Sequence, residues 1–126
     1  MKYSIITNNN KVFNFYKETD SVVFLQDSSI NEILEFVNEK CFEGHQLLSD
    51  PILYNLENQS NPFKSILIGK DILKDNSHSI KMTTGVLDLI EKVKFSPKED
   101  LTEIELEEFR FVDLNLIRNS IEKLIF

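Results

Sequence analysis

Three short polar segments carry the side chains best suited to bind or act on a small ligand. The first is Thr7-Asn8-Asn9, which follows an apolar segment and precedes a short predicted helix. Side-chain amides and the N–H groups that open a helix are suitable donors to a polar or anionic ligand. The same residue types also fit ordinary turn and capping chemistry. The segment has no glycine-rich loop, which excludes the dinucleotide-binding and Walker signatures.

The second segment contains Gly44-His45 and, further on, Asp50-Pro51. Histidine titrates near neutral pH, so His45 is a candidate general acid or base that Asp50 would orient. In the other interpretation, Gly44 ends a helix and the His45 ring contacts the last helical carbonyls. The second histidine, His78, lies in a different segment, and we therefore expect no metal site.

The third segment is Asn61-Pro62-Phe63-Lys64-Ser65, at the start of a predicted strand. Its Lys64 would either bind an anion or pair with a surface carboxylate. The resulting candidates are His45 and Asp50 for catalysis and, for ligand binding, Thr7, Asn8, Asn9, Gly44, His45, Lys64 and Ser65.

Hydrophobic patterning predicts the elements that position these segments. Apolar runs predict strands at residues 2–7, 21–26 and 64–68. Capping-box spacing and a helical apolar stripe predict a helix from Ser29 that Gly44 ends. We expect an irregular segment over residues 45–63, a polar loop over 70–79, and a helix within 80–94 that starts at Thr83 or Thr84 because of Gly85.

The end of the chain is predicted to contain a helix with one apolar stripe. Asp113 is a candidate cap for this helix, and residues 105–112 before it fit a short strand or a docking segment. The alternation of strands and helices predicts a single α/β domain over residues 1–126. We expect a small three-layer sandwich with a mainly parallel sheet, the first strand central, and helices on both faces.

This parallel arrangement places the ligand site beyond the carboxyl ends of the strands, next to Asn8. It also creates a conflict, because Lys64 would then lie at the opposite edge of the sheet from Asn8. The long segment over residues 45–63 would have to fold back across the sheet to bring both residues to one site.

Composition narrows the range of functions. The net charge of −7 and the presence of only two arginines, Arg110 and Arg118, argue against nucleic-acid binding. The acidic run at residues 99–108 is typical of a solvated surface. The single cysteine, Cys41, cannot form an intramolecular disulfide and is predicted to be buried. With no apolar run long enough to span a bilayer and no secretory signal, we expect a cytoplasmic protein without membrane partner or cofactor.

Taken as an ordered set, three motifs resemble the GrdX family, small proteins encoded alongside the glycine, sarcosine and betaine reductases of anaerobic bacteria. The motifs are Ile5-Ile6-Thr7-Asn8-Asn9, Gly44-His45-Gln46-Leu47-Leu48-Ser49-Asp50-Pro51 and Asn61-Pro62-Phe63-Lys64-Ser65, with a looser match in the tail. The resemblance implies an accessory role near amino-acid reduction, and it supplies no catalytic residues.

The leading hypothesis is therefore an accessory protein that binds a small metabolite or a partner protein of the reductase system. The alternative is a small enzyme that acts on a polar or anionic substrate, with His45 as general acid or base, and this requires His45 and Asn8 to line one pocket. A third interpretation is a homodimer formed through the last helix, because Leu116 and Phe126 lie away from its main apolar stripe.

Overall fold

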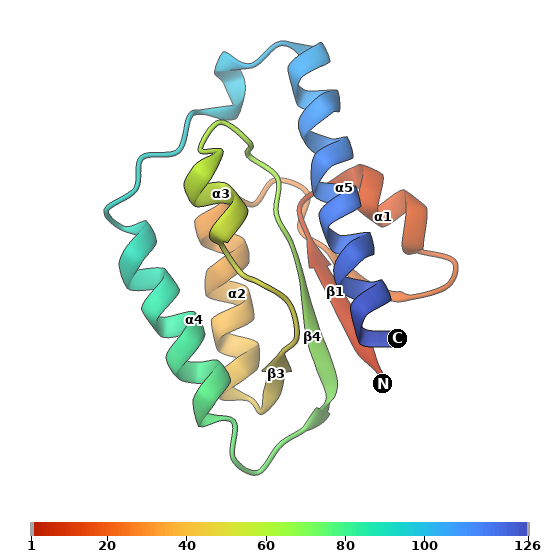
Figure 1. The fold of residues 1–126 in the computed structure, drawn as a ribbon, viewed down its shortest axis with the longest axis vertical. Helices are drawn as coiled ribbons and strands as arrows, with labels where there is room; N and C mark the ends of the chain where they lie inside the picture. The colour runs from red at the N-terminus through yellow and green to blue at the C-terminus, as the bar shows by residue number, and fades with distance from the viewer. Residues whose placement is uncertain (1, 126) are drawn as a thin grey trace.

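A four-stranded sheet organises the protein, and the computed structural model describes residues 2–125 (Figure 1). Within these residues the elements are β1 (Tyr3–Thr7), α1 (Asn10–Tyr16), β2 (Ser21–Phe24), α2 (Ile30–Phe42), β3 (His45–Leu47), α3 (Leu53–Glu57), β4 (Ser65–Ile72), α4 (Ser77–Ile90), the 3-10 turn η1 (Lys98–Asp100) and α5 (Glu103–Ile125). Among these helices, none combines the length and the apolarity needed to cross a membrane.

The sheet is mixed, with the strand order β2-β1-β4-β3. β1 lies between β2 and β4, as predicted for the first strand. It runs parallel to β2 but antiparallel to β4, and β4 is also antiparallel to β3. The prediction of a mainly parallel sheet is therefore wrong. Ile66, Leu67 and Ile68 form a continuous apolar run because both faces of β4 are buried, and such a run carries no information about strand direction.

Helices pack against both faces of the sheet, and adjacent residues of β1 separate the two apolar clusters. Ile6 packs with α2 and α4, whereas Ile5 packs with α1 and α5. In Figure 1, α2 and α4 lie to the left of β4, and α1 and α5 lie to its right. Successive side chains of a strand point to opposite faces, so the adjacent residues Ile5 and Ile6 contribute one side chain to each cluster.

The helix α2 follows its sequence signals closely. The Ser29 side chain accepts from the Glu32 N–H, and the Glu32 carboxylate accepts from the Ser29 N–H, which completes the predicted capping box. Gly44 follows the helix with φ of +109°, a conformation that glycine adopts without strain. Cys41 is fully buried on the apolar face of α2.

Other predicted boundaries are wrong. Residues 45–63 contain the short strand β3 and the helix α3 instead of being irregular, and residues 70–72 continue β4. The helix α4 starts at Ser77, before the predicted Thr83 or Thr84, and continues through Gly85. A Cβ added at Gly85 would meet nothing within 4 Å, so this glycine lies on the open side of the helix. Residues 105–112 belong to the long helix α5, which Thr102 and Glu105 begin with a second capping box.

Candidate functional site

The antiparallel pairing of β1 and β4 removes the conflict over Lys64. Because β4 runs opposite to β1, its first residues lie beside the last residues of β1, and Thr7 pairs with Ser65. The Asn8 N–H donates to the Lys64 carbonyl over 3.3 Å. The first and third polar segments therefore meet at one end of the sheet without any folding back of the intervening chain.

Asn8 joins three segments through its side chain. Its Oδ1 accepts from the Lys64 N–H at 2.8 Å, and its Nδ2 donates to the carbonyls of Ser28 at 2.9 Å and Pro62 at 3.1 Å. Both amide hydrogens and the carbonyl oxygen are thereby bonded to the protein. Asn8 consequently fixes the loops around it rather than presenting a free amide to a ligand.

Thr7 and Ser65 begin a chain of hydrogen bonds that ends on a buried carboxylate. The Thr7 Oγ1 accepts from the Asn9 N–H at 3.0 Å and lies 2.6 Å from the Ser65 Oγ, which donates to Asp113 Oδ2 at 2.7 Å. An ionised carboxylate only accepts hydrogen bonds, so when Asp113 is ionised the Ser65 hydroxyl donates to it and Thr7 donates to Ser65. Burial raises the pKa of Asp113, while the hydrogen bonds from Asn9 and Ser65 and the charge of Lys64 oppose this shift.

Asn9 connects this chain to both neighbouring helices. Its Oδ1 accepts from the Lys11 N–H at the start of α1, as predicted for a capping residue. Its Nδ2 donates to the Arg110 carbonyl at 2.9 Å and to Asp113 Oδ2 at 3.0 Å, both on α5. Asn61 makes a similar contact, since its Nδ2 donates to the Phe109 carbonyl at 3.3 Å. The prediction of Asp113 as a helix cap is wrong, because the residue lies within α5 and faces the sheet.

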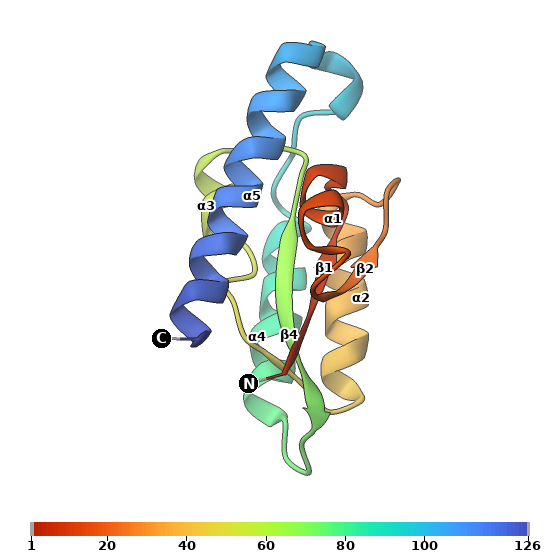
Figure 2. The ribbon, with the colours of Figure 1, turned by 90° about the vertical axis from the view of Figure 1, so that its right-hand side faces the viewer.

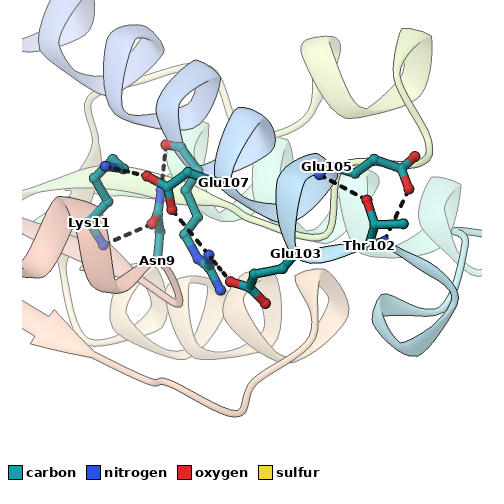
Figure 3. Close-up of polar contacts among 7 residues, drawn as sticks. Asn9, Lys11, Thr102, Glu103, Glu105 and Glu107 are labelled. Carbon is teal, nitrogen blue, oxygen red and sulfur yellow. Dashed lines mark hydrogen bonds and ion pairs between the residues drawn. The ribbon is translucent and has the colours of Figure 1, made fainter.

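Ion pairs close the outer side of the same junction (Figure 3). The Lys11 ammonium lies 2.5 Å from Glu107, and the Arg110 guanidinium lies 3.1 Å from Glu103 and 3.3 Å from Glu107. Glu107 thus receives one cation from α1 and one from α5. These acids are largely exposed, so the ion pairs add little stability beside the buried hydrogen bonds.

Lys64 is 5% exposed and points beneath α3. Its Nζ donates to Asn55 Oδ1 at 3.1 Å, and the Asn55 amide in turn donates to the carbonyls of Asn61 and Phe63. Burial lowers the pKa of Lys64, and the nearby charges of Asp113 and Asp50 oppose this shift. We call the buried set at this end of the sheet the Asp113 network: Thr7, Asn8, Asn9, Asn55, Asn61, Lys64, Ser65 and Asp113.

Gly44 and His45 lie far from the Asp113 network. His45 pairs with Ile72 at one end of β4, whereas Thr7 pairs with Ser65 at the other end. A strand rises about 3.4 Å per residue, so the seven steps from Ser65 to Ile72 span about 24 Å. The His45 ring bonds to the Gly69 carbonyl over 2.7 Å at Nδ1. A single pocket lined by His45 and Asn8 does not form.

Asp50 is bonded to backbone and not to His45. Its carboxylate accepts from the Ile52 and Leu53 N–H groups at 3.1 to 3.3 Å, which begins α3. The orienting contact to His45 that the sequence suggested is absent from the hydrogen bonds of residues 2–125. The same part of the chain contains no group of three or more His, Cys, Asp or Glu side chains arranged to hold a metal ion.

A cleft of about 650 Å³ opens beside Asn8. It lies between the β2–α2 loop with the first turn of α2, the Pro62-Phe63 segment, and residues 93–99. Of the seven predicted ligand-binding residues, only Asn8 lines it. Its charged lining residues are Asp27, Lys94, Lys98 and Glu99.

A second depression, which we call the apolar groove, measures about 530 Å³ and lies between α3 and α4. Leu53, Met82 and Leu89 are its exposed apolar residues. Asp50 and His78 lie along it. The groove is separate from the cleft, and the two share no lining residue.

Sequence reasoning missed three members of the Asp113 network: Asn55, Asn61 as a helix-binding residue, and Asp113 itself. Asp113 carried a usable signal. It falls on the apolar stripe of α5, seven residues after Leu106 and four before Ile117, and all three are buried. A carboxylate on the buried face of a helix requires polar partners from another element.

Comparison with known proteins identifies one family. A search of curated proteins and a search of solved structures each find no match to the chain. The family model described as GrdX-like protein matches residues 4–122. This match covers nearly the whole chain, including every residue of the Asp113 network. The chain therefore belongs to the GrdX-like family.

Proposed function

We propose that this protein is an accessory protein of amino-acid reductase metabolism that binds a small metabolite carrying a carboxylate group in the cleft beside Asn8. The family supports the metabolic setting. The cleft itself is the observation that carries the binding proposal. A role as an enzyme with His45 and Asn8 in one site has no support, because these residues lie at opposite ends of β4.

The position of the cleft in the sheet favours ligand binding. β1 and β2 run parallel, and the residues that follow their carboxyl ends, Asn8 and Gln26, both line the cleft. In α/β proteins, ligands bind preferentially beyond the carboxyl ends of parallel strands. The hydrogen bonds of Asn8 to Ser28 and Pro62 tie two parts of this lining together, so the cleft is preorganised.

The lining groups favour a carboxylate. The Ser29 side chain already caps Glu32, but Ile30 and Asn31 are first-turn residues of α2 whose N–H groups have no acceptor within the helix. Both residues line the cleft, as do Lys94 and Lys98. The carboxylates of Asp27 and Glu99 lie in the same lining. A small amino acid or an N-methylated amino acid carries both charges. Its carboxylate would face the lysines and the helix N–H groups, and its ammonium group would face Asp27 and Glu99.

The proposal is testable by titrating ¹⁵N-labelled protein with glycine, sarcosine, betaine and acetate. We expect saturable shifts of the Ile30 and Asn31 amide resonances. The double variant Lys94→Ala/Lys98→Ala should weaken binding about fivefold, since one partly screened ion pair contributes about 1 kcal/mol.

The matched control is Lys70→Ala/Lys74→Ala, which removes two exposed lysines near the far end of β4. This control should bind as the parent protein does. The proposal is wrong if no probe shifts the cleft amides at concentrations of about 10 mM, well above a millimolar dissociation constant. It is also wrong if both double variants weaken binding equally.

A further inference from the structure

The outward face of α5 carries large apolar side chains at regular spacing. Ile104, Phe111 and Ile125 are 75%, 56% and 62% exposed. They occur at intervals of 7 and 14 residues along α5, and Arg118 fills the remaining heptad position between Phe111 and Ile125. We call these four residues the outer stripe. A heptad repeat keeps its members on one side of a helix, so the outer stripe forms a seam along the whole of α5.

The rest of the protein leaves the three apolar residues of this seam exposed. α5 packs against β4 and α1 through a face about a quarter turn away, where Leu106, Leu114, Ile117 and Ile121 are buried. Figure 1 shows α5 in the foreground with α1 beside it and no element in front of it. The N-terminal half of α5 also extends beyond the end of the sheet (Figure 2). The apolar surface of α5 is therefore wider than the part that the rest of the domain buries, and the exposed part is available to a partner.

We infer that the outer stripe is the interface of a homodimer in which α5 packs antiparallel against α5 of a second copy. The stripe reads Ile-Phe-Arg-Ile from residue 104 to residue 125, so its two ends are alike. A two-fold axis near the middle of α5 brings Ile104 close to Ile125 of the second copy. The same axis brings Phe111 close to Arg118 of the second copy, a pair suited to a cation–π contact. Arg118 makes such a contact within the chain, 5.3 Å from the centre of the Phe15 ring.

The distribution of charge selects the antiparallel orientation. The N-terminal half of α5 carries four exposed glutamates (103, 105, 107 and 108) against one cation, Arg110, whereas the C-terminal half carries two cations, Arg118 and Lys123, against one acid, Glu122. Parallel packing would place the acidic segments of the two copies side by side, where like charges repel. Antiparallel packing places each acidic segment beside the half that carries the cations, and Glu108 then lies within one turn of Arg118 of the second copy.

The sequence-based hypothesis of a dimer used Leu116 and Phe126, and Leu116 does not belong to the outer stripe. It is 38% exposed and lies about 150° around the helix from the outer stripe, on nearly the opposite side. Phe126, the other residue in that hypothesis, lies outside the described residues. The interface therefore depends on Ile104, Phe111, Arg118 and Ile125.

Sedimentation velocity over a dilution series tests the dimer directly. We expect a species of twice the 14.7 kDa chain mass that dissociates on dilution. Phe111→Glu should raise the dimer dissociation constant about tenfold or more, because a central aromatic residue typically dominates a small interface. The control Met82→Glu replaces another exposed apolar side chain, in the apolar groove, and should leave the dissociation constant unchanged.

Cysteine cross-linking tests the orientation. Asn115 lies at the middle of α5, so Asn115→Cys should form a disulfide with its own counterpart under mild oxidation. Ile104→Cys should not, because antiparallel packing separates the two copies of residue 104 by about 30 Å. The native Cys41 is buried and serves as an unreactive background.

A chain that remains monomeric at all concentrations overturns the proposal, and the outer stripe would then face some other partner. A dimer that Met82→Glu dissociates and Phe111→Glu leaves intact assigns the interface to the apolar groove and also overturns it. Cross-linking at residue 104 but not at residue 115 refutes the antiparallel arrangement. None of these outcomes depends on the ligand of the cleft, so the two proposals fail independently.

Discussion

At the Ser65 end of β4 the polar side chains bond to one another in the interior. At the Ile72 end the half-buried imidazole of His45 makes one hydrogen bond, to the Gly69 carbonyl. The Asp113 network connects β1, β4, α3 and α5 through hydrogen bonds between buried side chains. Both ends carry residues of the three sequence motifs that resemble the GrdX family. The comparison shows that the same residue types have a structural role where they are buried and bonded, and that a binding role has to be sought in the adjacent cleft.

The largest expected effect comes from removing the carboxylate on which the network converges. Asp113→Ala leaves the Ser65 hydroxyl and the Asn9 amide without their acceptor and Lys64 without a nearby opposite charge. We expect a loss of about 3 to 5 kcal/mol in the free energy of unfolding, measured by urea denaturation at neutral pH.

Two variants show whether this loss belongs to the network. Asp113→Asn keeps the shape and one acceptor oxygen, and should lose less. Asp88→Ala removes an exposed aspartate from α4 and should change the free energy of unfolding by less than about 0.5 kcal/mol. If Asp113→Ala cost no more than Asp88→Ala, the buried network would contribute no more to stability than an exposed residue, and its structural role would be refuted.

An intermediate effect is expected at the other end of β4, and its origin is steric. Gly44 has φ of +109°, and a Cβ added there would lie 2.7 Å from Ile72 Cγ2. Gly44→Ala should therefore lower the free energy of unfolding by about 2 to 3 kcal/mol, as a strained backbone and a close contact combine.

Gly85→Ala provides the matched control with the opposite sign. Gly85 lies within α4, and a Cβ there meets nothing within 4 Å. The substitution should raise the free energy of unfolding by about 0.5 to 1 kcal/mol, because alanine favours a helix interior. Equal losses in both variants would show that the left-handed conformation of Gly44 is unimportant.

The smallest effect should follow the loss of the imidazole. His45→Ala removes one hydrogen bond from a half-buried side chain, so we expect a loss of about 1 kcal/mol by the same urea measurement. Ligand binding in the cleft should be unchanged, since His45 lies at the far end of β4. A loss of unfolding free energy as large as that of Asp113→Ala would show that the two ends of β4 contribute equally to stability. Weaker ligand binding would return His45 to the functional site.

Local signals predicted much of the secondary structure. The cap of α2 at Ser29, its end at Gly44 and the capping role of Asn9 before α1 all depend on contacts within a few residues. The location of strands β1, β2 and β4 also followed from short apolar runs. Patterns of this kind failed for β3 and α3, because elements of three and five residues are too short to show a period.

The long helix α5 shows how a polar residue can mislead. Asp113 divides the apolar stripe, and an acidic residue before an apolar run is typical of a helix start. The helix continues through it because Asn9 and Ser65, about a hundred and about fifty residues away in sequence, supply its hydrogen bonds. No local pattern contains that information.

By itself the sequence determined the helices with capping signals, the buried strands, the central place of β1 and the membership of the family. Only the tertiary structure decided the direction of β4, and with it which polar segments meet. Reversing β4 brings Lys64 and Ser65 to Asn8 and takes His45 away. The physical reason is that a strand buried on both faces has the same apolar pattern in either direction, so long-range packing and hydrogen bonding select its direction.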